Sequence, residues 1–206
     1  MQLVVENVTQ HYDHLVRFGP WNFTVPSGSA LIVTGDNGSG KSTLLRTLAG
    51  LMPPHQGQVR FDGGMPDASI AEQCHHVAYL NAVKPELTAA ENLAQWAGIL
   101  GHGPEALTAE AALDRLGMAA FLNTPAGYLS TGLKRRLALA RLLVAPRPLW
   151  LLDEPTAALD MAACRAVADV IGEHLDDGGL AVIATHLDLE LDGQPTLDLT
   201  PASAAT

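Results

Sequence analysis

The 206-residue chain has no long uncharged apolar run, and this absence argues against a membrane-spanning helix. A transmembrane helix needs roughly 18 or more consecutive apolar residues, so we expect any membrane association to go through another subunit. The most apolar stretch, LALARLLVAPRPLWLL, is interrupted by Arg141, Arg147 and two prolines. The start of the chain lacks a basic segment followed by an apolar one, so we expect no signal peptide.

Cysteine is scarce, and its placement argues against a disulfide or a zinc site. Cys74 and Cys164 stand far apart and form no CxxC pair, so free reduced thiols are expected. The adjacent residues Cys74, His75 and His76 invite a metal or haem interpretation. Adjacent residues on a strand or loop point in different directions, so we do not expect direct ligation.

Basic residues are also few, at 12 Lys and Arg against 22 Asp and Glu, with a formal net charge of −10. A general nucleic-acid binder needs a positive field towards phosphates, so this class is disfavoured. The basic residues that cluster at 134–141 are equally explained as the solvated side of a helix. With 48% hydrophobic residues, a mean hydropathy of +0.14 and this length, we expect one globular domain, residues 1–206, with some apolar surface covered by a partner.

Hydrophobic periodicity predicts an α/β fold that contains a helical insert. Three helical patterns follow one another without a convincing strand between them, which predicts a helical subdomain at about residues 84–143. Two prolines, Pro53 and Pro54, are expected to stop the first helix. The predicted strands are 3–9, 22–28, 29–35, 149–155 and 180–186, and the predicted helices are 41–51, 87–100, 108–117, 133–144 and 160–179.

The stretch GDNGSGKS, residues 35–42, fits the pattern GxxxxGKS, with a strand before it and a helix after it. Its glycines let consecutive backbone N–H groups surround phosphate oxygens, and the helix amino terminus adds partial positive charge. We expect Lys41 to reach the β- and γ-phosphates, Ser42 to ligate Mg²⁺ and Thr43 to donate to the α-phosphate. The predicted nucleotide-binding residues here are Gly35, Asp36, Asn37, Gly38, Ser39, Gly40, Lys41, Ser42 and Thr43.

Two further apolar strands end in residues that suit hydrolysis. LWLLDEP places Asp153 and Glu154 at a strand end, where Asp153 is expected to hold Mg²⁺ and Glu154 to polarise the attacking water. VIATH ends at His186, which we expect to contact the γ-phosphate, because parallel strands meet at one sheet edge. The predicted catalytic residues are therefore Glu154, His186 and Lys41.

In order along the chain, GDNGSGKST, LSTGLKRR, LWLLDEP, TAALD and ATH resemble the motifs of ATP-binding cassettes, the nucleotide-binding domains of ABC transporters. The resemblance extends over residues 3–199. It implies the P-loop NTPase fold of an ABC ATPase, which has a RecA-like parallel core sheet, an antiparallel β subdomain and an α-helical subdomain. It also implies Mg²⁺-dependent ATP hydrolysis, with ATP and Mg²⁺ as ligands.

The resemblance assigns further binding residues across a homodimer. It implies that Ser130 and Gly132 of LSTGL contact the γ-phosphate bound by Lys41 of a second copy, and that Asp160 couples the two sites. Tyr12 stands where the family often stacks an aromatic ring on adenine, although a core or surface tyrosine is an equal alternative.

A narrower resemblance is to the ATPase subunits of the cytochrome c maturation complex, also called the haem exporter. It is carried by LNAVKPELTAAENLAQWAGILG, LSTGLKRRLALARLL and the short length of the chain. It implies integral membrane partners and a peripheral position on the cytoplasmic face of the bacterial inner membrane. The alternatives are the ATPase of another small ABC transporter, a soluble ABC ATPase acting on ribosomes or DNA, and a regulatory module that holds ATP without turnover.

Two departures from the family pattern affect these expectations. Leu133 replaces the glutamine that normally ends the signature, so the contact across the dimer is expected to be weaker. The family's glutamine between core and helical subdomain is missing from HHVAYLNAVKPELT, where Tyr79 or Asn81 stands nearby. We assign a metal contact to neither residue.

Overall fold

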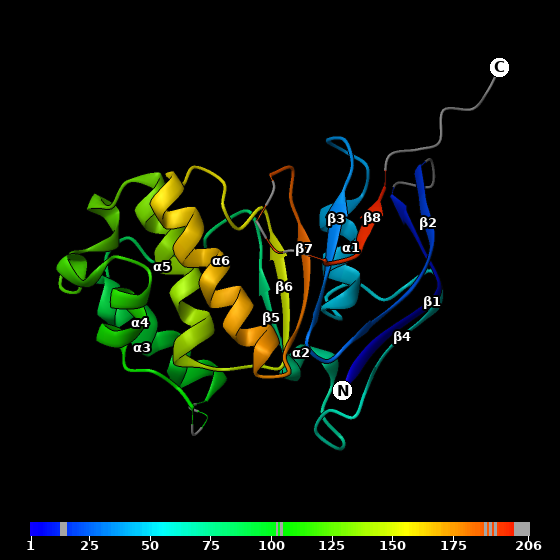
Figure 1. Ribbon diagram of the computed structural model, residues 1–206, viewed down its shortest axis with the longest axis horizontal. Helices are drawn as coiled ribbons and strands as arrows, with labels where there is room; N and C mark the ends of the chain where they lie inside the picture. The colour runs from blue at the N-terminus through cyan, green and yellow to red at the C-terminus, as the bar shows by residue number, and fades with distance from the viewer. Residues whose placement is uncertain are drawn as a thin grey trace.

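The computed structural model describes residues 1–12, 16–101, 103, 105–187, 189, 191 and 193–199, without the side chains of residues 12, 16 and 17. Two sheets and a group of helices are arranged side by side (Figure 1). The strands are β1 (Gln2–Tyr12), β2 (Val16–Pro26), β3 (Ser29–Thr34), β4 (Gln56–Asp62), β5 (Cys74–Val77), β6 (Leu149–Asp153), β7 (Leu180–Ala184) and β8 (Thr196–Asp198). The α-helices are α1 (Lys41–Leu48), α2 (Ile70–Gln73), α3 (Ala89–Leu100), α4 (Ala109–Arg115), α5 (Thr131–Val144) and α6 (Met161–Asp176). Two short 3-10 turns, η1 (Ala119–Phe121) and η2 (Ala126–Tyr128), lie between α4 and α5.

The parallel sheet has the strand order β5-β6-β7-β3-β8, and it confirms the predicted α/β class. Because its strands run in one direction, β3, β5, β6 and β7 end at the same edge. The loops that follow these strands carry the phosphate-loop sequence, the segment around Tyr79, the Asp153–Glu154 pair and His186. The topology alone therefore gathers four separate stretches of sequence.

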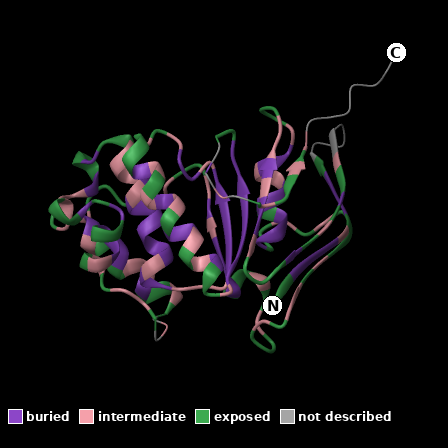
Figure 2. Cartoon of the chain, viewed as in Figure 1, coloured by how far each residue is buried: buried purple, intermediate pink, exposed green. Residues whose placement is uncertain are grey.

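Both faces of this sheet are covered, which explains its nearly continuous apolar strands. In β6, Leu149 and Leu151 pack with α1 and the antiparallel sheet, whereas Trp150 and Leu152 pack with α6 and the helical segment. Figure 2 shows the central strands buried along their length. The alternation follows from the two-residue period of a strand.

The second sheet is antiparallel, with the order β2-β1-β4, and it packs over α1. The strand expected at 22–28 overlaps the second half of β2, which begins earlier, at Val16, and ends at Pro26. Sequence analysis predicted no strand at β4, β5 or β8. Strand β4 is largely exposed, and β5 and β8 have only four and three residues. Such strands show little hydrophobic alternation, and pairing with neighbours is what places them in a sheet.

Three helices and two 3-10 turns occupy the chain between β5 and β6. Thr88 caps α3 in a reciprocal arrangement with Glu91, which stabilises the helix start. Helix α5 begins at Thr131 rather than near Leu133 as expected, because Ser130 accepts a hydrogen bond from the Leu133 N–H as the N-cap. Within the described residues, none of the helices combines the length and the apolarity needed to cross a membrane.

Candidate active site

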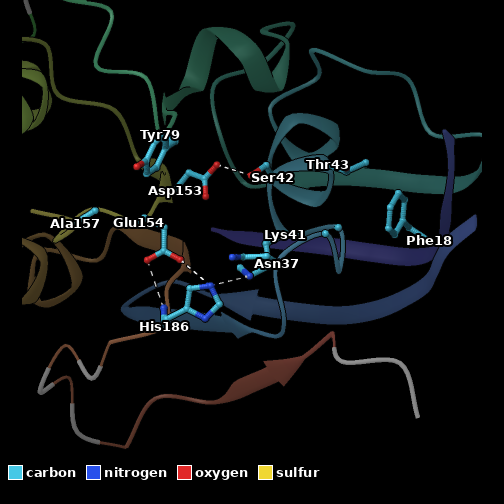
Figure 3. Close-up of a pocket in the computed structure, with 12 residues that line it drawn as sticks. Phe18, Asn37, Lys41, Ser42, Thr43, Tyr79, Asp153, Glu154, Ala157 and His186 are labelled. Atoms are coloured by element: carbon cyan, nitrogen blue, oxygen red, sulfur yellow. Dashed lines mark hydrogen bonds and ion pairs between the residues drawn. The ribbon is translucent and has the colours of Figure 1, made fainter. Parts of the chain in front are cut away.

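A cavity of about 630 Å³ opens at the carboxyl edge of the parallel sheet (Figure 3). It lies where the loops after β3, β5, β6 and β7 meet. Its lining residues are Phe18, Asn37, Gly38, Gly40, Lys41, Ser42, Thr43, Tyr79, Asp153, Glu154, Ala157 and His186. The fold thus brings together the predicted catalytic residues Lys41, Glu154 and His186.

The loop after β3 uses glycines at positions whose backbone conformation other residues rarely adopt. Gly38 and Gly40 have φ angles of +86° and +102°, a region that side chains rarely adopt. A Cβ atom on Gly40 would lie 2.6 Å from Cδ1 of Phe18. Gly40 is the N-cap of α1, so the loop leads directly into the amino terminus of that helix. The arrangement suits an anion, because backbone N–H groups and the helix dipole are both available.

Lys41 is buried at 7% exposure, and its ammonium group is held by the loop itself. Its Nζ donates to the carbonyl oxygens of Gly35 at 2.5 Å and Asp36 at 3.1 Å, and lies 3.2 Å from Nε2 of His186. Gly35 and Asp36 therefore contact Lys41 through their backbones. Ser39, whose N–H donates to the Asp36 carbonyl, completes the turn.

Ser42 and Asp153, the two residues predicted to hold Mg²⁺, lie side by side. Oγ of Ser42 donates to Oδ2 of Asp153 at 2.6 Å, and Asp153 is buried at 5% exposure. Within the described residues, no group of three or more His, Cys, Asp or Glu residues could hold a metal. One hydroxyl and one carboxylate nevertheless fit Mg²⁺, which takes few protein oxygens and completes its shell with water and phosphate oxygens.

Glu154 and His186 form a pair among the residues that line the cavity. Oε1 of Glu154 lies 3.4 Å from Nε2 of His186, and the His186 backbone N–H donates to Oε2 at 3.4 Å. The Glu154 backbone has φ +49°, which a non-glycine residue rarely adopts, and its N–H donates to the Ala184 carbonyl at 2.8 Å. The backbone thus directs this carboxylate into the cavity, as Figure 3 shows.

Ser130, Gly132 and Asp160 share a second cavity of about 410 Å³, and none of them lines the cavity around Lys41. Ser130 is the N-cap of α5, and Asp160 is the N-cap of α6, where Oδ1 accepts from the Ala163 N–H at 2.8 Å. A Cβ on Gly132 would lie 2.7 Å from the Ala158 carbonyl, so glycine is required for this close approach. The fold separates these residues from Lys41 within one chain.

Three residues of the site escaped sequence analysis in these roles. Phe18 and Tyr79 line the cavity, and Arg135 contacts the backbone of Asp153 and Glu154 from behind. The proximity of Gly40 to Phe18 has no short-range sequence signal, because 22 positions separate them. The side chain of Tyr12, the residue predicted to stack on adenine, lies outside the described residues.

Comparison with known proteins decides the family. The family model described as ABC transporter matches residues 18–157. The chain belongs to the ABC transporter family. As a cassette of this family it is an ATP-hydrolysing enzyme, as the geometry around Lys41 and Glu154 suggests.

Individual relatives agree with this assignment. The cassette is 46% identical over 202 residues to a protein of Chelativorans sp. (strain BNC1) named cytochrome c biogenesis ATP-binding export protein CcmA, covering 97% of this chain and 98% of that protein. It is 44% identical over 203 residues to the protein of the same name from Rhizobium meliloti (strain 1021), with 97% and 98% covered. The identity is thus spread over nearly the whole length of both relatives.

A solved structure supplies a further likeness. A dimeric ATP-binding cassette in a post-hydrolysis state, bound to ADP and Pi, superposes with a TM-score of 0.77 at 26% identity, covering 90% of this chain and 88% of that chain. That protein shows a cassette of this fold as a dimer with hydrolysis products.

Proposed function

We propose that this cassette is the ATP-hydrolysing subunit of a membrane complex for cytochrome c biogenesis, in which it energises haem export and release of the haem-loaded chaperone CcmE. The observation that carries the ATPase part is the cavity that joins Lys41, Asp153, Glu154 and His186. The link to cytochrome c rests on relatives named CcmA that match over nearly the full chain at 44–46% identity.

The proposed partners are integral membrane subunits, namely CcmB together with CcmC and CcmD. The cassette would then lie peripherally on the cytoplasmic face of the bacterial inner membrane, held there by these subunits. Residues 1–206 act as one nucleotide-binding domain, with residues 84–143 as its helical subdomain. The three helices between β5 and β6 support this division.

In the proposed mechanism the triphosphate lies along the loop between β3 and α1. Lys41 leaves its own loop carbonyls and donates to β- and γ-phosphate oxygens, so that it neutralises charge as the γ-phosphoryl group is transferred. Thr43 donates near the α-phosphate. The adenine ring extends towards Phe18, which lies at the end of the cavity away from Glu154 and His186 (Figure 3).

Glu154 orients the attacking water and accepts its proton, while His186 contacts the γ-phosphate beside it. The water oxygen forms a bond to the γ-phosphorus as the bond to the bridging oxygen of ADP breaks. Ser42 and Asp153 would hold Mg²⁺, which supplies charge stabilisation to the phosphates when bound.

Ser130, Gly132 and Asp160 serve the triphosphate of a second copy. The proposal rests on their separate cavity, since a γ-phosphate held by Lys41 would not lie between these residues of the same chain. The amino terminus of α5, beginning at Thr131, adds its dipole to this contact.

The first prediction concerns Glu154→Gln. The amide cannot accept the water proton, so kcat for Mg²⁺-dependent ATP hydrolysis should fall by about 10²-fold or more, while ATP affinity is retained. Phosphate release and equilibrium ATP binding measure the two quantities on the purified chain. The exposed Glu173→Gln, outside the cavity, is the matched control. Undiminished turnover in Glu154→Gln would contradict the proposed role of Glu154 as the general base.

A second measurement addresses the partner. Affinity purification from detergent-solubilised membranes, followed by identification of the copurifying proteins, should yield an integral membrane subunit of the cytochrome c maturation system. Recovery of ribosomes in its place would support the soluble alternative.

A further inference from the structure

The buried guanidinium of Arg135 lies behind the end of β6, next to residues that line the active-site cavity. Arg135 lies on the second turn of α5 and is only 3% exposed. A guanidinium carries five N–H donors in a fixed plane and no acceptor. Burying it is costly unless each donor has a partner, so the identity of those partners indicates what the residue does.

Every donor of Arg135 has an acceptor, and the five acceptors belong to two segments. On one side, Nε donates to the Pro155 carbonyl at 3.2 Å, and Nη2 donates to the carbonyls of Asp153 and of Glu154, the latter at 2.9 Å. These are three consecutive carbonyls at the corner after β6.

On the other side, Nη1 donates to the Ala78 carbonyl at 2.7 Å and to Oδ1 of Asn81 at 3.1 Å. These two acceptors flank Tyr79 and Leu80, which are 66% and 80% exposed. The segment between them therefore projects from the surface while Arg135 holds both its ends.

The corner that Arg135 binds is the one whose conformation directs the Glu154 carboxylate. Glu154 has φ +49°, and a non-glycine residue keeps such a strained conformation only where its surroundings hold it there. The Glu154 N–H donates to the Ala184 carbonyl. Arg135 donates to the carbonyls of the two residues that flank Glu154, Asp153 and Pro155. Arg135 does not touch the cavity itself.

We propose that Arg135 is a positioning residue for ATP hydrolysis, which fixes the backbone of Glu154 and joins it to the exposed Tyr79–Leu80 segment through Asn81 and the Ala78 carbonyl. This inference rests on the proposed ATPase function. One rigid group then connects the helix that begins at Ser130, the corner at Glu154 and a surface segment. A shift of that segment or of α5 is transmitted directly to the carboxylate that orients water.

These hydrogen bonds connect the segment at residues 78–81 to the site, although the segment lacks the family's glutamine. Asn81 is half-buried and offers one amide oxygen to Arg135. The connection runs through protein donors and acceptors alone and needs no contact between residues 78–81 and the metal.

The test is the variant Arg135→Lys, which keeps the positive charge but has one donor group in place of the planar fork. A misplaced general base predicts a kcat lower by about 10- to 100-fold, with KM for ATP changed by less than about 2-fold. Asn81→Ala, at a half-buried position, should lower kcat by a smaller factor of about 2- to 5-fold. The fold-decrease in kcat of the double variant should be smaller than the product of the two single decreases, because both changes break the same hydrogen bond between Arg135 and Asn81.

Arg141→Lys is the matched control. Arg141 lies on the same helix at 5% exposure, and it donates to the His76 carbonyl and stacks over Trp96, away from the Glu154 corner. Its kcat should equal that of the parent chain. An Arg135→Lys variant that keeps parental kcat, while Glu154→Gln does not, would overturn this inference and leave the proposed function standing.

Amide hydrogen exchange tests the same inference without activity. In the nucleotide-free chain, Arg135→Lys should speed exchange in the peptide that contains the Glu154 N–H, and Arg141→Lys should not. Unchanged exchange at this corner contradicts the positioning role, even if the parent chain shows no hydrolysis and the proposed function fails.

Discussion

At the scale of single residues, the site depends on side chains that face a phosphate loop from different strands. Phe18 belongs to β2, in the antiparallel sheet, yet its ring lies against Gly40 of the loop after β3. Only glycine at position 40 leaves room for that ring. The contact places an aromatic ring at the end of the cavity opposite Glu154, where the proposed mechanism places the adenine ring.

Phe18→Ala should weaken ATP and ADP binding alike. Stacking of a base on an aromatic ring is worth about 1–3 kcal/mol, which corresponds to a rise in Kd of about 5- to 150-fold. Phe18→Trp should keep most of the affinity, and kcat at saturating ATP should change little. Equilibrium titration with both nucleotides measures this.

Phe23→Leu provides the control, because Phe23 lies on the same strand but does not line the cavity. Equal losses of nucleotide affinity in Phe18→Ala and Phe23→Leu would mean that Phe18→Ala acts by disturbing the sheet and not by removing a contact with adenine.

At the scale of elements, a buried histidine, His75, and a half-buried one, His174, tie strand β5 and helix α6 to the core in their neutral forms. His75 lies in β5, with Nε2 2.6 Å from the Ala145 carbonyl, and burial lowers its pKa to about 3. His174 of α6 stacks on Trp150 at 3.7 Å between ring centroids, and burial lowers its pKa to about 4. The folded chain therefore resists protonation of both rings.

The sign of the pH effect follows from these pKa values. An unfolded histidine has a pKa near 6.5, so between about pH 6.5 and 4 the unfolded state binds protons that the folded state does not. The contribution of each ring is complete above pH 6.5 and is lost as the pH falls towards its folded pKa. Between pH 7.5 and 5, each histidine should lower the free energy of unfolding by about 2 kcal/mol.

Urea unfolding at pH 7.5 and pH 5 measures the loss. His75→Gln retains an amide donor for the Ala145 carbonyl but cannot titrate, so its loss between the two pH values should be smaller than that of the parent. An equal loss of unfolding free energy in the two proteins would show that His75 does not contribute to the pH dependence of stability.

At the scale of the whole molecule, one chain carries two separate cavities, which the proposed function treats as two halves of a catalytic site. The cavity of Lys41 lies at the edge of the parallel sheet, and the cavity of Ser130 lies between the starts of α5 and α6. An isologous dimer brings unlike parts of two identical chains together twice. Each catalytic site would then form at the seam between copies.

Mixing two defective chains tests this seam. Lys41→Ala removes the phosphate contact, and Ser130→Asp keeps an N-cap oxygen for α5 but places negative charge against the γ-phosphate. Each variant alone should lack turnover. A 1:1 mixture forms dimers of which about half are mixed, each with one intact site, so the rate should return to about a quarter of the parent value. No recovery, or full turnover in a monomeric parent, would contradict the dimeric site.

The sequence alone determined which residues could carry the chemistry. The pattern GDNGSGKS between an apolar strand and a helix predicted the phosphate loop, and Asp153, Glu154 and His186 at strand ends predicted the groups around it. These signals are local, because a turn, a helix start and a strand end each depend on neighbouring residues. The α/β class followed from the same periodicity and is confirmed.

Tertiary structure decided everything that joins distant positions. Phe18 meets Gly40 across two sheets, Arg135 reaches the corner at Glu154 from a helix beginning at Thr131, and Ser130 lies away from Lys41. The short strands β5 and β8 likewise form by pairing and not by their own pattern. Contacts between positions far apart in the chain leave no periodic signal in one sequence, because packing and backbone hydrogen bonds select them only once the sheet has formed.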